Sequence, residues 1–101
     1  MDFGLKPCDL EEIIAILKRY PEITAAIIFG SRAKGNYKPG SDVDIAIKGA
    51  DISSASVAIL AMILNEDSDM PYYFDLVHYE EITEKALVDH IDRVGRVFYS
   101  A

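Results

Sequence analysis

The most constraining feature of this sequence is a strict alternation over residues 42–48, Asp-Val-Asp-Ile-Ala-Ile-Lys. Branched apolar side chains stand at every second position, and acids, alanine and lysine stand between them. Successive side chains of a β-strand point to opposite faces, so the alternation predicts a strand with one apolar face. Asp42 and Asp44 then project together from the other face. The chain therefore has to build a sheet that carries two carboxylates side by side at the start of one strand.

The rest of the pattern alternates between helical and strand periods. It predicts a helix over 9–19, a buried strand over 24–29, a loop or short helical turn over 30–40, and the strand over 42–48. A buried helix over 52–64, an aromatic strand over 72–79, a helix after residue 83 and a short strand over 97–99 follow. This order predicts an α/β (α+β) domain in which a small mixed sheet of three to four strands is flanked by helices.

Capping residues predict where the helices begin and end. Asp9 has an acid three positions further on, which is the spacing of a capping box at the start of the first helix. Asp51 or Ser53 caps the second long helix, and the pattern leaves both open. Thr83 is in place to cap the last helix, and Gly95 is in place to end it.

Composition limits the class of protein. The chain has 101 residues, of which 50% are hydrophobic and 27% charged, which fits one folded domain over 1–101 and excludes a disordered chain. No apolar run reaches the ~20 residues of a membrane span, and the N-terminus lacks the basic start of a secretory signal. The single cysteine, Cys8, cannot form an internal disulfide, which fits a reducing cytoplasm. The net charge of −7 makes strong nucleic-acid binding unexpected.

The two aspartates are unusual for a pair with only a structural role. Aspartate is depleted in strands, and neighbouring carboxylates raise each other's cost of ionisation unless a cation lies between them. Two oxygen anions on one face are what a hard divalent ion such as Mg²⁺ requires. The alternative is that both project into water beside the loop, and a lone Asp-x-Asp favours that alternative.

The loop before the aspartates changes this balance. Gly30 and Ser31 directly follow an apolar strand, where glycine lets backbone amides approach a phosphate and serine adds a hydroxyl donor. The segment 30–40 contains three cations and no acid; the cations are Arg32, Lys34 and Lys38. A nucleoside triphosphate needs donors and cations for its phosphates and acids for the metal that bridges them. The basic loop alone, or the pair of acids alone, is typical of a solvated polar turn. The two next to each other favour a nucleotide site.

Other phosphate and metal motifs are excluded by their spacing. Gly30 and Gly35 have the spacing of a P-loop, but Asn36 and Tyr37 stand where lysine and serine or threonine are required. No Gly-x-Gly-x-x-Gly is present, so there is no dinucleotide fingerprint. An EF-hand starting at Asp42 lacks its third ligand and its glycine.

Gly-Ser, ten further residues and Asp-x-Asp on a strand together resemble the signature of the polymerase β-type nucleotidyltransferase superfamily. The chain is most similar to the minimal, stand-alone members of that superfamily (MNT domains), and the resemblance extends over essentially its whole length. A third carboxylate in this family comes from a later strand, and Asp75 stands at the corresponding place. The combination is much more specific than a single Asp-x-Asp.

The resemblance implies a role for each residue that matches the motif. Gly30 and Ser31 are expected to hold the β- and γ-phosphates, with Arg32 as a helper and Ser41 touching the triphosphate. Asp42 and Asp44 are expected to coordinate two Mg²⁺ ions. Asp75 is expected to bind the catalytic metal and to take or orient the proton of the attacking hydroxyl.

Physical chemistry gives Asp75 the same assignment by a separate argument. Tyr73 and Val77 share its face of the predicted strand, and burial of a carboxylate without a partner is expensive. A metal ion would supply that partner. The alternative is a carboxylate at the edge of the sheet that faces water.

The resemblance also implies a function. The chain is expected to move a nucleoside monophosphate, AMP from ATP, onto a hydroxyl acceptor, although the sequence does not rank ATP against other nucleoside triphosphates. Minimal members of the family are paired with a separate helical partner of the HEPN type in toxin–antitoxin systems, which makes a hydroxyl on that partner the expected acceptor. The alternatives are an antitoxin that neutralises its partner by binding alone, and a sensor that binds nucleotide without transferring it. The sequence does not determine the oligomeric state, and an oligomer is compatible with it.

Overall fold

Four short strands form one mixed sheet. They are β1 (Ala25–Phe29), β2 (Val43–Lys48), β3 (Phe74–His78) and β4 (Arg96–Ser100), and their spatial order is β3-β2-β1-β4. β1 pairs antiparallel with both β2 and β4, whereas β2 and β3 run parallel. The computed structural model describes residues 3–38 and 40–101. The mixed sheet and the order of elements predicted from the sequence are confirmed.

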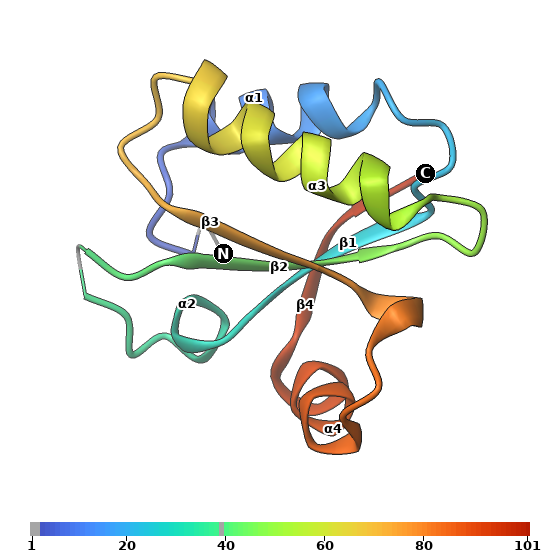
Figure 1. The fold of residues 1–101 in the computed structure, drawn as a ribbon. Coiled ribbons are helices and arrows are strands. Elements are labelled where there is room, and N and C mark those ends of the chain that lie inside the picture. The colour runs from blue at the N-terminus through green and yellow to red at the C-terminus, as the bar shows by residue number, and fades with distance from the viewer. Residues whose placement is uncertain (1–2, 39) are drawn as a thin grey trace.

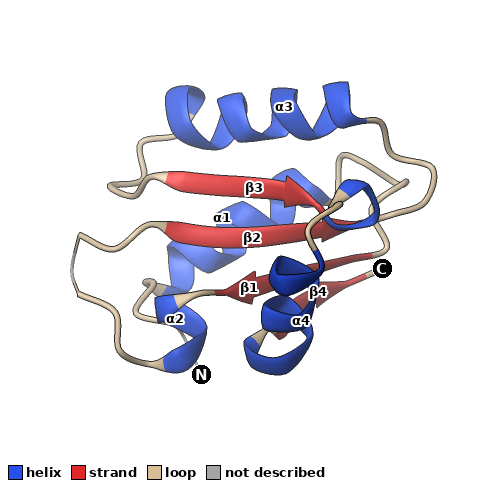
Figure 2. Cartoon of the chain, turned by 60° about the horizontal axis from the view of Figure 1, so that its bottom comes forward, coloured by secondary structure: helices blue, strands red, loops and turns tan. Residues whose placement is uncertain are grey.

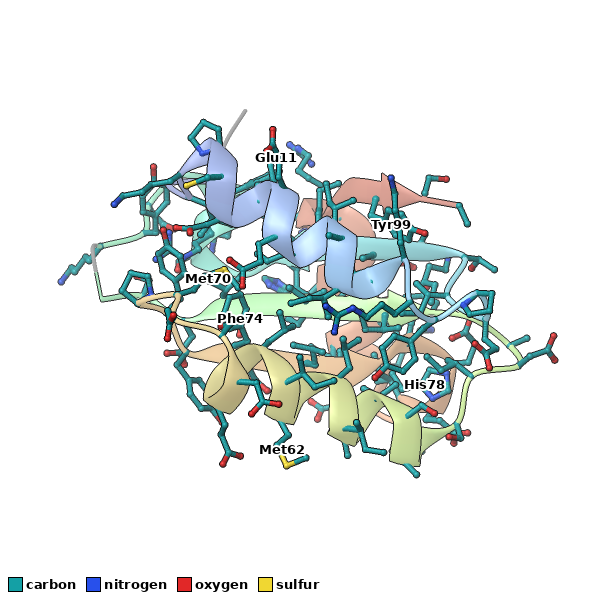
Figure 3. The ribbon with its side chains drawn as sticks, turned by 90° about the horizontal axis from the view of Figure 1, so that it is seen from above. Glu11, Met62, Met70, Phe74, His78 and Tyr99 are labelled. Atoms are coloured by element: carbon teal, nitrogen blue, oxygen red, sulfur yellow. The ribbon has the colours of Figure 1, made fainter. Side chains whose placement is uncertain are left out.

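Helices cover both faces of this sheet (Figure 1). On one face lie α1 (Pro7–Leu17) and α3 (Ser54–Met62), and on the other lie the short α2 (Ser31–Lys34) and α4 (Lys85–Val94), which Figure 2 turns toward the viewer. Seen from above, α1 and α3 are neighbours, with Phe74 between them and Met62 on the outer side of α3, away from α1 (Figure 3). Within the described residues, no helix has the length and apolar character that crossing a membrane requires.

The alternation in β2 builds the core on one face and the candidate site on the other. Val43, Ile45 and Ile47 are fully buried against the layer formed by α1 and α3. On the opposite face Ala46 is also fully buried, because it joins a second, smaller cluster with α4. Asp44, two residues earlier on that face, is only half-buried. The second cluster therefore covers the middle of this face and leaves its start, at Asp44, open.

The first helix begins earlier than its capping box predicts. α1 starts at Pro7, and its N-cap Lys6 makes no side-chain capping bond. Proline suits the first helical turn because its missing N–H has no partner there in any case. Asp9 lies inside the first turn, and its carboxylate accepts a hydrogen bond from the Tyr72 hydroxyl at 2.8 Å. The predicted cap at Asp9 is therefore wrong.

The other helix ends follow the sequence in part. Ser53 caps α3, where its hydroxyl accepts from the backbone N–H of Ser56 at 3.0 Å. Beyond α3 the chain continues as a π-helical turn, η1 (Ile63–Asp67), and a 3-10 turn, η2 (Tyr79–Glu81), precedes α4. The N-cap of α4 is Glu84 rather than Thr83, so that prediction is wrong. Gly95 ends α4 as expected, but for a packing reason: a Cβ there would collide with the Ile91 carbonyl.

Arg32 is the centre of the loop that connects β1 and β2. Its side chain is only 2% exposed, although it belongs to a polar loop. The guanidinium donates to the carbonyl of Phe3 at 2.9 Å and to the carbonyl of Ser41 at 2.9 and 3.3 Å. It also lies over the rings of Tyr37 and Tyr72, 5.2 and 5.3 Å from their centroids. One buried cation thus ties the N-terminal segment and the residue before Asp42 to α2.

Removal of this guanidinium should destabilise the fold. We expect Arg32→Leu to lower the free energy of unfolding by about 2–4 kcal/mol, because the buried Phe3 carbonyl and the part-buried Ser41 carbonyl lose a charged donor. Arg32→Lys should fall between Arg32→Leu and wild type, since lysine restores the charge without the planar fork. Urea unfolding measures the difference. Lys34→Leu, on the exposed side of the same helix, is the matched control and should change stability by less than ~0.5 kcal/mol; equal effects of the two leucine variants would contradict this role.

Candidate functional site

Parallel pairing of β2 and β3 brings the three predicted acids to one place. Asp44 and Asp75 are register partners, although 31 residues separate them in the chain, and paired residues of neighbouring strands project from the same face. Asp42 lies just before β2 and is exposed, as is Asp75, whereas Asp44 is half-buried. The acids therefore meet where the two strands begin, on the open part of the face that α4 covers further along.

Like charges at this place raise the cost of ionising Asp44. Burial of its carboxyl and, to a smaller extent, the nearby negative charges of Asp75 and Asp42 together raise the pKa of Asp44 from 3.8 to about 6. A carboxylate in this situation gains from a cation. The arrangement thus has the electrostatic character of a site that binds a positively charged ligand.

The donor set fits Mg²⁺ better than it fits a structural metal. Among residues 3–38 and 40–101, no three His, Cys, Asp or Glu side chains converge into a ready-made cage for an ion. Mg²⁺ in nucleotide enzymes keeps several waters and is held by one or two carboxylates together with substrate phosphates. Mutually repelling carboxylates on one open face, with no closed cage, match that mode of binding.

Gly30 and Ser31 lie directly beside these acids. The last residue of β1, Phe29, is the register partner of Asp44, so the chain leaves β1 next to the carboxylates. Gly30 has a φ of 73°, and a Cβ there would collide with the Asp44 carboxylate. Glycine is therefore required both for its backbone conformation and for its close approach. Ser31, half-buried at the start of α2, follows at once.

Arg32 and Ser41, also predicted to contact the phosphates, make hydrogen bonds within the protein. Arg32 is buried, and all three of its nitrogen atoms donate to backbone carbonyls, so the guanidinium holds the loop; its role as a phosphate helper stays a prediction. The Ser41 hydroxyl accepts from the backbone N–H of Lys38 at 2.8 Å, which shapes the loop. Lys34 and Lys38 are exposed.

One positioning residue was not predicted from the sequence. The side-chain amide of Asn65, in η1, donates to the carbonyl of Phe74 at 2.8 Å and accepts from its N–H at 2.7 Å. These two bonds fix the start of β3 immediately before Asp75. The available signal was weak, because Asn65 is only the first of the polar residues 65–69 that follow the apolar helical run.

Comparison with known proteins agrees with this geometry. Residues 11–101 match the family model described as polymerase beta, nucleotidyltransferase. No curated protein matches the chain. A crystal structure of a toxin–antitoxin with AMP-PNP contains a chain that is 26% identical, with a TM-score of 0.76 over 91% of this chain and 73% of the other.

Two further structures are less than 25% identical and share the fold. A complex of a tri-AMPylated Shewanella oneidensis HEPN toxin with an MNT antitoxin matches at 22% identity and a TM-score of 0.72, over 96% of this chain and 74% of the other. A nucleotidyltransferase assigned in Sulfolobus solfataricus matches at 22% identity and a TM-score of 0.54, over 96% and 91%. Since the family model spans residues 11–101, the chain belongs to the polymerase beta nucleotidyltransferase family.

Proposed function

We propose that this chain is a Mg²⁺-dependent nucleotidyltransferase that moves AMP from ATP onto a hydroxyl of a HEPN-type partner protein and thereby acts as its antitoxin. The observation that carries the proposal is the register of β2 and β3, which sets Asp75 beside Asp44, next to Gly30. Membership in the nucleotidyltransferase family supports nucleotidyl transfer, and the similarity to a toxin–antitoxin chain crystallised with AMP-PNP supports the nucleotide and the partner.

The proposed reaction is an in-line displacement at the α-phosphorus of ATP. The acceptor oxygen forms a bond to phosphorus, the bond from phosphorus to the oxygen bridging the β-phosphate breaks, and pyrophosphate leaves with that electron pair. The acceptor's proton passes to the exposed carboxylate of Asp75. Gly30 and Ser31 hold the β- and γ-phosphates, with the Ser41 hydroxyl as a further donor. Asp42, Asp44 and Asp75 would hold Mg²⁺, two ions by family analogy, which neutralises charge on the attacking and leaving oxygens.

Removing the acids from the start of β2 should abolish transfer. With α-labelled ATP, Mg²⁺ and a HEPN-type partner, we expect Asp42→Asn with Asp44→Asn to lower label transfer by about 100-fold or more, because the charge that holds the metal is gone. Asp51→Asn with Asp89→Asn removes the same charge from exposed positions outside the site and is the control.

The same assay separates the alternatives. If wild type transfers no label and the Asp42 and Asp44 double variant still neutralises the partner, the protein is an antitoxin that acts by binding alone and not an enzyme. Calorimetric binding of ATP with Mg²⁺, and no AMP adduct on the partner by mass spectrometry, would indicate a nucleotide sensor.

The shifted pKa of Asp44 predicts a pH dependence of stability. Its folded-state pKa of about 6 exceeds the unfolded value of 3.8, so the native protein holds a proton that the unfolded chain releases in this window. The contribution of this group to stability is full below 3.8 and is lost as pH rises through about 6. Allowing for solvent screening, metal-free protein should lose about 1–2 kcal/mol from this group by pH 7, and Asp44→Asn should remove the loss.

Thermal unfolding of wild type and Asp44→Asn between pH 4 and pH 8 checks this prediction. Mg²⁺ should raise the stability of wild type above pH 6 and leave Asp44→Asn nearly unchanged. Parallel stability curves for the two proteins would show that the pKa of Asp44 is not raised in the folded state.

Gly30 offers a test of the close approach to Asp44. Gly30→Ala and Gly35→Ala both place a side chain at a positive φ, 73° and 87°, but only the first meets another group within 4 Å. We expect Gly35→Ala to cost about 1 kcal/mol of stability and to keep activity, whereas Gly30→Ala should also lower AMP transfer at least ~10-fold by displacing Asp44. Equal losses of activity in the two variants would contradict the proposed geometry.

A further inference from the structure

The outer edge of β3 carries backbone groups that face away from the sheet. β3 is the end strand. The Val43 N–H donates to the Tyr73 carbonyl at 2.8 Å, and this bond shows which residues of β3 make the hydrogen bonds to β2. In a parallel ladder with this phase, alternate residues of β3 turn both backbone groups toward β2. The residues between them, Phe74, Leu76 and His78, direct their N–H and C=O groups outward.

Asn65 already imitates one residue of an added strand at this edge. Its amide makes both a donor and an acceptor bond to Phe74, as a neighbouring strand would. Leu76 is the next outward residue, and no hydrogen bond among the described residues reaches its backbone N–H or C=O. The edge is therefore closed at Phe74 and open at Leu76.

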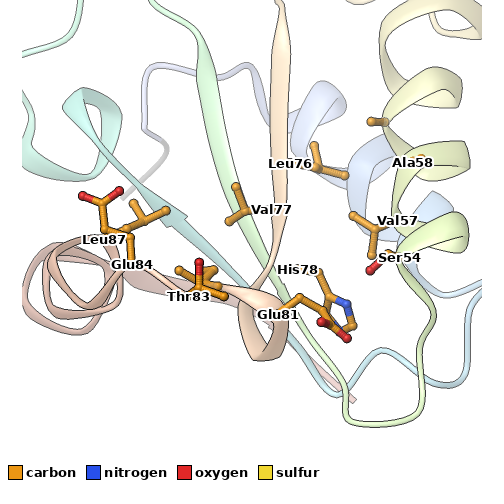
Figure 4. A pocket seen from close by; sticks show the side chains of 12 residues that line it. Ser54, Val57, Ala58, Leu76, Val77, His78, Glu81, Thr83, Glu84 and Leu87 are labelled. Atoms are coloured by element: carbon orange, nitrogen blue, oxygen red, sulfur yellow. The ribbon is translucent and has the colours of Figure 1, made fainter.

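A groove of about 500 Å³ lies along this open edge (Figure 4). Leu76 and Val77 point to opposite faces of β3 and yet both line the groove, so the groove straddles the strand edge itself. α3 forms one wall, and the segment from η2 into α4 forms the other. The apolar side chains of these walls are Val57, Ala58, Ala61, Ile82 and Leu87.

The polar groups of the groove favour a basic occupant. Glu81 and Glu84 line the wall formed by η2 and α4 and are exposed, and the lining residues include no lysine or arginine. A second copy of β3 would bring its own Glu81 and Glu84 against this rim, which disfavours self-pairing. His78 also lines the groove, and its buried Nδ1 has no hydrogen-bond partner among the described residues.

Asp75 links this groove to the candidate active site. It directly precedes Leu76, and its side chain shares a face with Val77. The residue of an added strand that lies opposite Asp75 would have its Cβ about 4.5–5.5 Å away. A hydroxyl at that position lies next to the carboxylate that receives the proton in the proposed reaction.

We propose that the acceptor protein binds by adding an extended segment to the edge of β3. The segment places apolar side chains in the groove, lysine or arginine against Glu81 and Glu84, and its acceptor hydroxyl opposite Asp75. This inference rests on the proposed function for the chemistry of the acceptor. The docking itself needs no catalysis.

A peptide probe tests the docking directly. In antiparallel pairing, acetyl-Lys-Lys-Val-Ala-Tyr-Gly-amide sets its alanine opposite Leu76, its tyrosine opposite Asp75 and its lysines toward Glu81. We expect backbone amide shifts and slowed hydrogen exchange at Leu76 and His78 on titration, followed by NMR. The same peptide with N-methylalanine has one donor fewer and should bind about tenfold more weakly.

Two pairs of protein variants supply matched controls. Leu76→Pro removes the outward N–H without removing a bond to β2, whereas Leu76→Ala loses side-chain packing and keeps the N–H. The proline variant should bind the probe about tenfold more weakly than the alanine variant, with thermal unfolding checking that both are folded. Glu81→Lys with Glu84→Lys should also weaken binding, whereas Glu11→Lys with Glu12→Lys on α1 should not.

Several results would overturn this proposal. In the peptide titration these are absence of binding, equal binding of the methylated and unmethylated peptides, and amide shifts confined to residues away from β3. A dimer of this chain that Leu76→Pro dissociates would show that the edge of β3 pairs with a second copy instead. AMP transfer to the intact partner distinguishes a failure of strand addition at β3 from a failure of the proposed function. Unchanged transfer by Leu76→Pro would reject strand addition and leave the proposed function standing, whereas probe binding with no transfer by wild type would reject the proposed function alone.

Discussion

Repulsion among three carboxylates is the constraint on which the rest of this structure depends. The parallel register of β2 and β3 sets Asp44 against Asp75, and the pKa of Asp44 near 6 reflects both burial and that repulsion. The same strand is held by its other face, where Val43 and Ile45 are completely buried. Apolar burial of this kind contributes about 1.5–3 kcal/mol for each side chain, so one face of β2 offsets the cost of the other.

The segments around the acids hold the first residues of β2 and β3 in place. Arg32 anchors the loop before Asp42 through the Ser41 carbonyl, and Asn65 fixes Phe74, the residue before Asp75. Gly30 lets the chain leaving β1 pass against the Asp44 carboxylate. Groups that repel each other need rigid supports, and here the supports are hydrogen bonds to backbone groups adjacent to the acids.

Local pattern predicted the elements of this fold well and their long-range contacts poorly. The alternation over 42–48 identified β2 because strand burial follows a period of two, and Ser53 was among the predicted caps. The burial of Arg32 depends on the Phe3 carbonyl, 29 residues away, which no local pattern reveals, so the sequence did not predict that this cation of a glycine-rich loop is buried. The pairing of Asp75 with Asp44 is likewise a matter of register: the family resemblance indicated Asp75 as a third acid from a later strand, but nothing in the sequence predicted its partner.

The position of Asp75 on an end strand separates the two substrates of the proposed reaction. Gly30 and the loop after β1 approach the acids from the β1 side of β2, whereas β3 has no neighbouring strand on its other side. A triphosphate held on the β1 side of the acids leaves the outer edge of β3 for the acceptor. An open edge also invites unwanted pairing. Asn65 closes the part of that edge nearest the acids, and Glu81 and Glu84 make the remainder unfavourable for a second copy of this acidic chain. What remains open is short, flanked by negative charge and adjacent to the proposed general base, which are the properties that a selective acceptor site requires.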